Sequence, residues 1–129
     1  MEAGVSGTIR VLLADDDPPF LDSLALLIER QADLAVADTA SDGLAAIELA
    51  EKLRPDAIVI DLHMPLLDGV TAVARLRRDH PSMCILALTG DVHPALHQAA
   101  MDAGADAVLY KGEFVEALVD RLAAAKAAV

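Results

Sequence analysis

Residues 9–16, Ile-Arg-Val-Leu-Leu-Ala-Asp-Asp, form an apolar run that stops at two adjacent carboxylates. The same pattern recurs three times: residues 57–60 precede Asp61, residues 84–88 precede Thr89, and residues 107–110 precede Lys111. Apolar runs of this length between turn residues are typical of strands buried on both faces of a sheet. The carboxyl ends of parallel strands share one edge, where open α/β sheets place their sites. We therefore expect the polar residues that end these runs to meet: Asp15, Asp16, Asp61, Thr89 and Lys111.

Helical patterns fill the intervals between the strands, and a further strand is expected at about residues 34–38. Pro18 and Pro19 suit the first turn of the first helix. Ser41 or Asp42 is a candidate N-cap of the second helix and Asp91 of the fourth, while Asp68-Gly69 leads into the third. Five strand–helix repeats predict an α/β fold, a doubly wound parallel sheet with helices on both faces.

Composition sets limits on the class of protein. A chain of 129 residues, 55% of them apolar, predicts a single domain over residues 1–129 with its core at about 8–122. The one cysteine, Cys84, cannot form an internal disulfide, which favours a cytoplasmic protein, and its place in a strand predicts a buried thiol. A net charge of −11 without a basic stripe argues against direct nucleic-acid binding. No apolar run is long enough to span a membrane.

The expected carboxylate cluster predicts a metal site. Carboxylates held about 4–5 Å apart repel each other by several kcal/mol, and a hard cation such as Mg²⁺ offsets that repulsion. A single aspartate would be explained as a helix cap, but Asp15 and Asp16 on one strand opposed by Asp61 on another indicate a functional site. Lys111 and the hydroxyl of Thr89 add groups that bind phosphoryl oxygens.

The chain resembles a response-regulator receiver domain of two-component signalling, from about Thr8 to Leu122. The resemblance rests on Asp15-Asp16-Asp17, on Asp61-Leu62-His63-Met64-Pro65 with Asp68-Gly69, on Leu88-Thr89-Gly90 and on Tyr110-Lys111. It implies a flavodoxin-like (βα)5 fold with strand order 2-1-3-4-5, and a signalling protein that is not an enzyme acting on outside substrates.

The resemblance also implies roles for the site residues. Asp61 accepts a phosphoryl group from a histidine kinase or a phosphotransfer protein. Mg²⁺ is held by Asp16, Asp61 and the backbone carbonyl of His63, with Asp15 contributing mostly through water. Thr89 and Lys111 contact the phosphoryl oxygens. Signals leave through the fourth helix, fifth strand and fifth helix, a face that could meet an output domain or a second copy of the chain.

Some positions depart from the family pattern. Gly112 replaces the proline that usually follows the lysine, so a trans bond and a looser loop are expected there. Val108 replaces the usual switch aromatic, and Tyr110 is expected on the other face of the strand. Gly112 and the pattern at residues 103–106 resemble receivers that precede helix-turn-helix domains.

These departures leave more than one function open. The main alternative is a receiver-like interaction module with weak or no phosphorylation switching. A phosphatase that acts on outside substrates would need a second aspartate where His63 stands.

Overall fold

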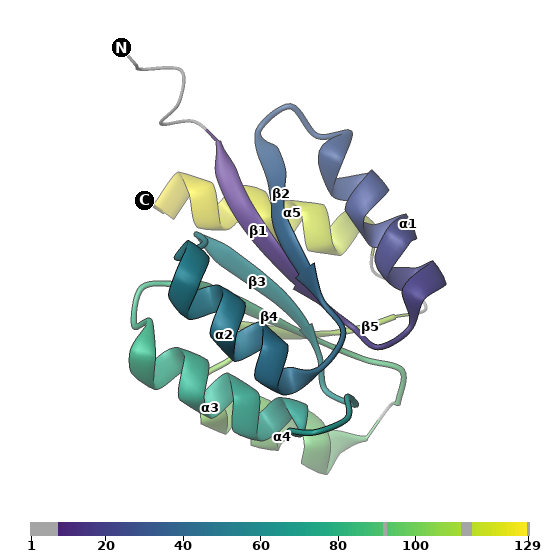
Figure 1. Ribbon diagram of the computed structural model, residues 1–129, viewed down its shortest axis with the longest axis vertical. Coiled ribbons are helices and arrows are strands. Elements are labelled where there is room, and N and C mark those ends of the chain that lie inside the picture. The colour runs from purple at the N-terminus through teal and green to yellow at the C-terminus, as the bar shows by residue number, and fades with distance from the viewer. Residues whose placement is uncertain (1–7, 92, 112–114, 129) are drawn as a thin grey trace.

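The computed structural model describes residues 8–91, 93–111 and 115–128, and it shows alternating strands and helices around one sheet (Figure 1). The strands are Ile9–Ala14 (β1), Leu34–Ala40 (β2), Ala57–Asp61 (β3), Cys84–Thr89 (β4) and Ala107–Tyr110 (β5). The helices are Pro18–Glu29 (α1), Gly43–Leu53 (α2), Gly69–Asp79 (α3), Pro94–Ala103 (α4) and Val115–Ala128 (α5).

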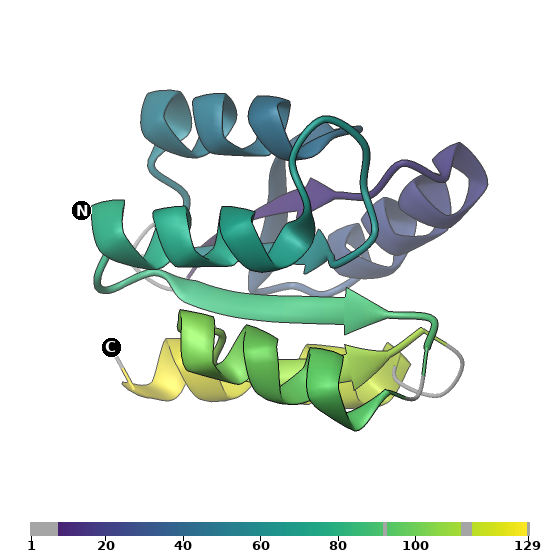
Figure 2. The same cartoon turned by 90° about the horizontal axis from the view of Figure 1, so that it is seen from below.

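All strand pairs are parallel, and their order is β2-β1-β3-β4-β5. The arrowheads in Figure 2 point to the same end of the sheet, so the carboxyl ends of the strands form one edge. The predicted α/β fold and the strand order are confirmed.

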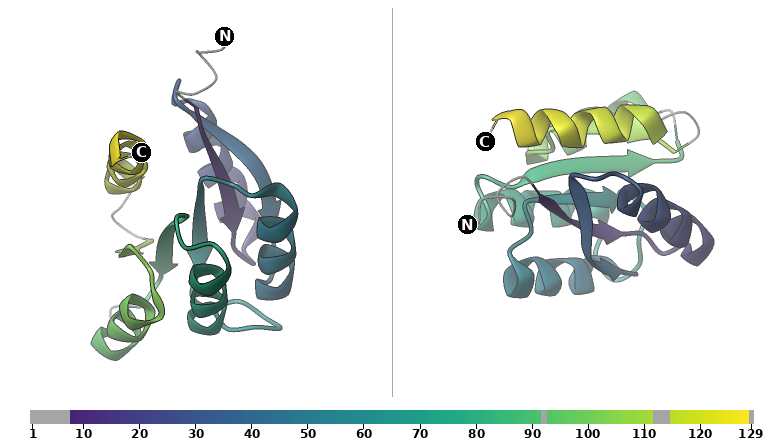
Figure 3. Two further views of the ribbon diagram at one scale, coloured as in Figure 1. Left: turned by 90° about the vertical axis from the view of Figure 1, so that its left-hand side faces the viewer. Right: turned by 90° about the horizontal axis from the view of Figure 1, so that it is seen from above.

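The sheet separates two apolar clusters, because alternate residues of each strand point to opposite faces. Leu13 and Val59 pack with α1 and α5, whereas Leu12 and Ile58 pack with α2, α3 and α4. Figure 3 shows α5 and α2 on opposite sides of the sheet in both views. Since both faces of the central strands β1, β3 and β4 are covered, their polar groups reach solvent near the strand ends.

One of the two predicted helix caps is confirmed, at Asp42, and the structure adds a cap at Asp68. Asp42 accepts a hydrogen bond from the N–H of Ala45 (2.8 Å), and Asp68 accepts one from the N–H of Thr71 (2.9 Å). The prediction that Asp91 caps α4 is wrong: α4 starts at Pro94, with His93 as its N-cap. Proline suits the first helical position because the N–H that it lacks has no intrahelical partner there.

Two further expectations about the sheet need correction. β2 extends to residue 40 rather than 38, with a register irregularity opposite Val11 and Leu12. Cys84 is half-buried rather than buried. The expectations about Gly112 lie outside the described residues. No helix in the described part of the chain is long and apolar enough to cross a membrane.

Candidate functional site

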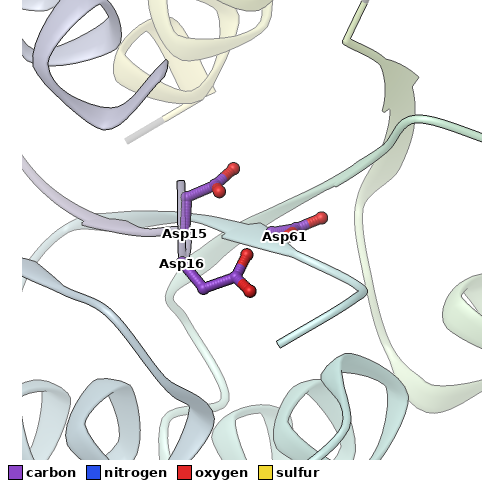
Figure 4. A group of neighbouring side chains, drawn as sticks. All are labelled: Asp15, Asp16 and Asp61. Carbon is purple, nitrogen blue, oxygen red and sulfur yellow. The ribbon is translucent and has the colours of Figure 1, made fainter. Parts of the chain in front are cut away.

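Two neighbouring strand ends supply the carboxylates. Asp15 follows β1, and its N–H donates to the carbonyl of Ala40 in β2 (3.0 Å). Its Oδ1 accepts the N–H of Asp17 (2.9 Å), which fixes the carboxylate against the start of α1. Asp61 ends β3, directly beside β1. Figure 4 shows the side chains of Asp15, Asp16 and Asp61 gathered at this edge.

The three carboxylates are close enough to share a cation. One oxygen from each of Asp15, Asp16 and Asp61 lies within 4.8 Å of the others. Asp15 and Asp61 are 1% and 2% exposed, while Asp16 is exposed to solvent. Carboxylate oxygens with access to water suit Mg²⁺, which retains several water ligands. The donor set and its spacing therefore fit this ion.

Lys111 brings a positive charge to the same carboxylates. Its Nζ lies 2.6 Å from Oδ2 of Asp15 and 3.5 Å from Oδ2 of Asp61. The N–H of Lys111 donates to the carbonyl of Thr89 (2.9 Å), which fixes the base of the side chain beside β4. Burial alone would lower the pKa of Lys111, but the neighbouring carboxylates of Asp15 and Asp61 outweigh it and raise the pKa. Lys111 is therefore a cation at neutral pH.

Asp61 is in an unfavourable place for a carboxylate. Burial raises its pKa above the usual range, and the charge of Asp15 raises it further. Lys111 and the backbone N–H of His63 lower it, but not enough to reverse the shift. A cation at this site would favour the ionised form, which is the nucleophilic one.

Thr89 and the loop after it form the mouth of the site. The Thr89 Oγ1 accepts the N–H of Asp91 (3.0 Å) and donates to its carbonyl (3.3 Å). Across the mouth, His63 Nε2 lies 3.2 Å from Asp91 Oδ2, and both side chains are exposed. The structure thus brings His63 and Asp91 together across the mouth of the site.

The family follows from comparison with known proteins. The family model described as the response regulator receiver domain matches residues 11–123. This chain belongs to that family. The transcriptional regulatory protein PrrA of Mycobacterium leprae is 42% identical, over 96% of this chain and 52% of PrrA. A protein-glutamate methylesterase/protein-glutamine glutaminase of Anaeromyxobacter dehalogenans is 40% identical, over 84% of this chain and 32% of that protein.

Solved structures agree with this family. The receiver domain of NarL from Mycobacterium tuberculosis has a TM-score of 0.82 at 29% identity, covering 90% of this chain and 97% of that one. The response regulator domain of Thermotoga maritima CheB has a TM-score of 0.87 at 27% identity, covering 93% and 97%. The receiver described here spans about half or less of the length of the curated relatives that it matches.

Strand β5 contains Val108 and Tyr110, the two residues discussed above in connection with the switch aromatic. Val108 is 8% exposed and belongs to the apolar cluster under α2, α3 and α4. The expectation that Tyr110 lies on the other face is wrong, because both residues belong to β5 and residues two apart in a strand share a face. The half-buried Tyr110 is thus on the same face as Val108, nearer the site.

One contact was not predicted from the sequence. The ammonium of Lys111 lies 4.6 Å from the centre of the Phe20 ring. In the sequence, Phe20 fits the apolar face of α1, and nothing in the pattern of neighbouring residues indicates that a charged side chain contacts it. Only its position one turn after the aspartates, at the carboxyl edge of the sheet, could have suggested this contact.

Proposed function

We propose that this receiver accepts a phosphoryl group on Asp61 from a phosphohistidine of a histidine kinase or phosphotransfer protein. The observation that carries the proposal is the pairing of the buried Asp61 with Lys111 (3.5 Å) beside a carboxylate cluster of magnesium-binding type. A carboxylate nucleophile and an anionic donor repel each other, so catalysis here depends on positioning and charge neutralisation.

The covalent step requires only an exchange of bonds at phosphorus. An Oδ atom of Asp61 forms the new O–P bond as the N–P bond of the donor breaks. The electron pair of that bond stays on the imidazole nitrogen, which takes up a proton. Lys111 and the hydroxyl of Thr89 then bind phosphoryl oxygens, and for this the Thr89 O–H must turn away from the Asp91 carbonyl to which it now donates.

Mg²⁺ would be held by Asp15, Asp16, Asp61 and the backbone carbonyl of His63, and when bound it would offset the negative charge of the carboxylates and of the donor. Among the three carboxylates, that of Asp15 depends most on a nearby positive charge. Its Oδ2 is buried and accepts no hydrogen bond of ordinary geometry, so Lys111 is the charge that balances it.

We further propose that the receiver works in the cytoplasm and signals through the face formed by α4, β5 and α5. The relatives are a regulator of transcription and a methylesterase, so one kind of receiver serves different outputs. We assign this chain the receiver's part alone, without an enzymatic activity on outside substrates. Its partners on the signalling face are an output domain or a second copy of the chain.

Incubation with acetyl phosphate and Mg²⁺, followed by intact-mass measurement, tests the phosphorylation. We expect the mass of one phosphoryl group to appear in the wild type and to be absent in Asp61→Asn or with excess chelator. Asp120→Asn, which removes an exposed carboxylate from α5, is the matched control and should be modified like the wild type. A mass gain that persists in Asp61→Asn contradicts the assignment.

A specific observation favours the second candidate, an interaction module that does not switch. Val108 is buried in β5 at the switch-aromatic position, and a valine has no ring to rotate. Backbone amide NMR with beryllofluoride and Mg²⁺ separates the two functions. A switching receiver shifts the signals of Gly90 and of α4, whereas changes confined to Asp15, Asp16 and Asp61 favour the interaction module.

A further inference from the structure

We propose that Phe20 is a positioning residue for phosphoryl transfer, because its aromatic face holds the ammonium of Lys111 between Asp15 and Asp61. This inference rests on the proposed function, since Lys111 is the group that Phe20 acts through. The Nζ of Lys111 lies 4.6 Å from the ring centre, within the roughly 6 Å range of a cation–π interaction.

One turn of the chain orients both Asp15 and Phe20 toward the ammonium of Lys111. Asp17 donates its N–H to Oδ1 of Asp15, and its carbonyl accepts the N–H of Leu21 in the first turn of α1. Phe20 lies in that turn. The segment therefore presents a carboxylate and an aromatic face to one lysine, and their relative placement is fixed by backbone hydrogen bonds.

The surroundings make this contact stronger than one at the surface. The Lys111 side chain is 22% exposed, and Phe20 is half-buried in the cluster with α1. The ammonium forms ion pairs with Asp15 and Asp61, which come from different strands. The ring adds a third attraction that needs no further negative charge at a site already crowded with carboxylates.

Lys111 needs such a restraint because its four-carbon side chain is flexible and loses conformational freedom when its ammonium is held in one place. With the ring in place, the ammonium stays close to Asp61, where it can meet an incoming phosphoryl oxygen. Without the ring, more of its conformations reach into solvent, and the rate of phosphorylation falls.

Graded fluorination tests the electrostatic role of the ring without changing its shape. Phe20 is replaced site-specifically by phenylalanine carrying one, two or three ring fluorines, which weaken the negative face in steps. We expect the rate of phosphorylation by acetyl phosphate to fall with each step, reaching about threefold to tenfold for the last, as the strength of partly buried cation–π contacts implies. The rate of phosphorylation should fall by a similar factor in Phe20→Leu, while Phe20→Trp should keep the wild-type rate.

A control variant separates positioning from general loss of packing. Leu24 is buried one turn further along α1, and Leu24→Val removes apolar contacts from the same helix. We expect it to lower the free energy of unfolding and to leave the rate unchanged. A rate that does not respond to fluorination, in a protein whose wild type is phosphorylated, overturns the proposal.

A second readout does not depend on phosphorylation. Protons above an aromatic ring resonate upfield, so the ε-methylene signals of Lys111 should be shifted upfield in the wild type and should return to ordinary values in Phe20→Leu. Absence of that shift in the wild type overturns the contact itself. If the shift is present but the wild type takes up no phosphoryl group, the proposed function has failed, and the role of Phe20 in the reaction fails with it.

Discussion

Asp61→Asn should stabilise the metal-free protein. At an effective dielectric constant of about 20, the repulsion between carboxylates about 4.8 Å apart is about 3 kcal/mol. The attraction between Asp61 and Lys111, 3.5 Å apart, is about 5 kcal/mol at the same dielectric constant and exceeds that repulsion. Burial of the Asp61 carboxylate costs several kcal/mol in addition. This cost exceeds the net attraction between the charges, in line with the raised pKa of Asp61. We expect the substitution to raise the free energy of unfolding by ~1–3 kcal/mol.

The substitution should leave no buried charge alone, since Lys111 keeps its closer partner, Asp15, at 2.6 Å. The pH dependence follows from the sign of the pKa shift. Because the pKa of Asp61 is raised on folding, its unfavourable contribution is absent below the unfolded value of 3.8, grows as the pH rises from that value toward the folded pKa, and is complete above it. The advantage of Asp61→Asn should therefore be largest at neutral pH and should shrink as the medium is acidified.

Urea unfolding with excess chelator, followed by circular dichroism between pH 7.5 and pH 4.5, measures this difference. Asp16→Asn is the matched control, because Asp16 belongs to the same cluster but is exposed. We expect it to raise the free energy of unfolding by less than half as much as Asp61→Asn does. A variant that is less stable than the wild type at pH 7.5 would refute the reasoning. So would a stability difference that does not change with pH.

Three further predictions concern other parts of the fold. Arg77→Met should lower the free energy of unfolding by about 2–4 kcal/mol in urea denaturation, because it removes four hydrogen bonds. The guanidinium donates them to Gly104 O (2.9 Å), Pro81 O (2.9 Å), Met83 O (2.8 Å) and Asp106 Oδ2 (2.8 Å). Arg78→Met is the control at an exposed arginine, and it should change the free energy of unfolding little. Asp68→Ala should cost about 1 kcal/mol through loss of the α3 N-cap; hydrogen bonds from Thr71 lower the pKa of Asp68, so this cost should disappear in acid as the pH falls through the lowered value. Burial raises the pKa of the Cys84 thiol to about 11, so its modification by iodoacetamide should be slow at pH 7.5 and accelerate up to that pH; fast reaction at pH 7.5 would contradict this.

Sequence reasoning was most successful where a local pattern has one physical solution. Apolar runs must be buried on both faces, so four of the five strands and their parallel arrangement could be predicted from the chain alone, while the order 2-1-3-4-5 came from the family resemblance. The strand at Leu34–Ala40 has no such run and is only partly buried, and its end was misplaced. The capping by Asp42 was also local, because the carboxylate and the Ala45 N–H that it accepts are three residues apart. The error at Asp91 arose from overlooking Pro94, whose preference for the first helical position moves the start of α4.

The sequence alone determined which polar groups end the strands, since each stands directly after an apolar run that must be buried. Only the tertiary structure decided how these groups pair: Lys111 lies nearer to Asp15 than to Asp61, Asp91 turns to His63, and the ring of Phe20 lies near the ammonium of Lys111. The physical reason is that strand patterns depend on neighbours along the chain. The contacts of a charged side chain depend instead on where the sheet brings distant strand ends together.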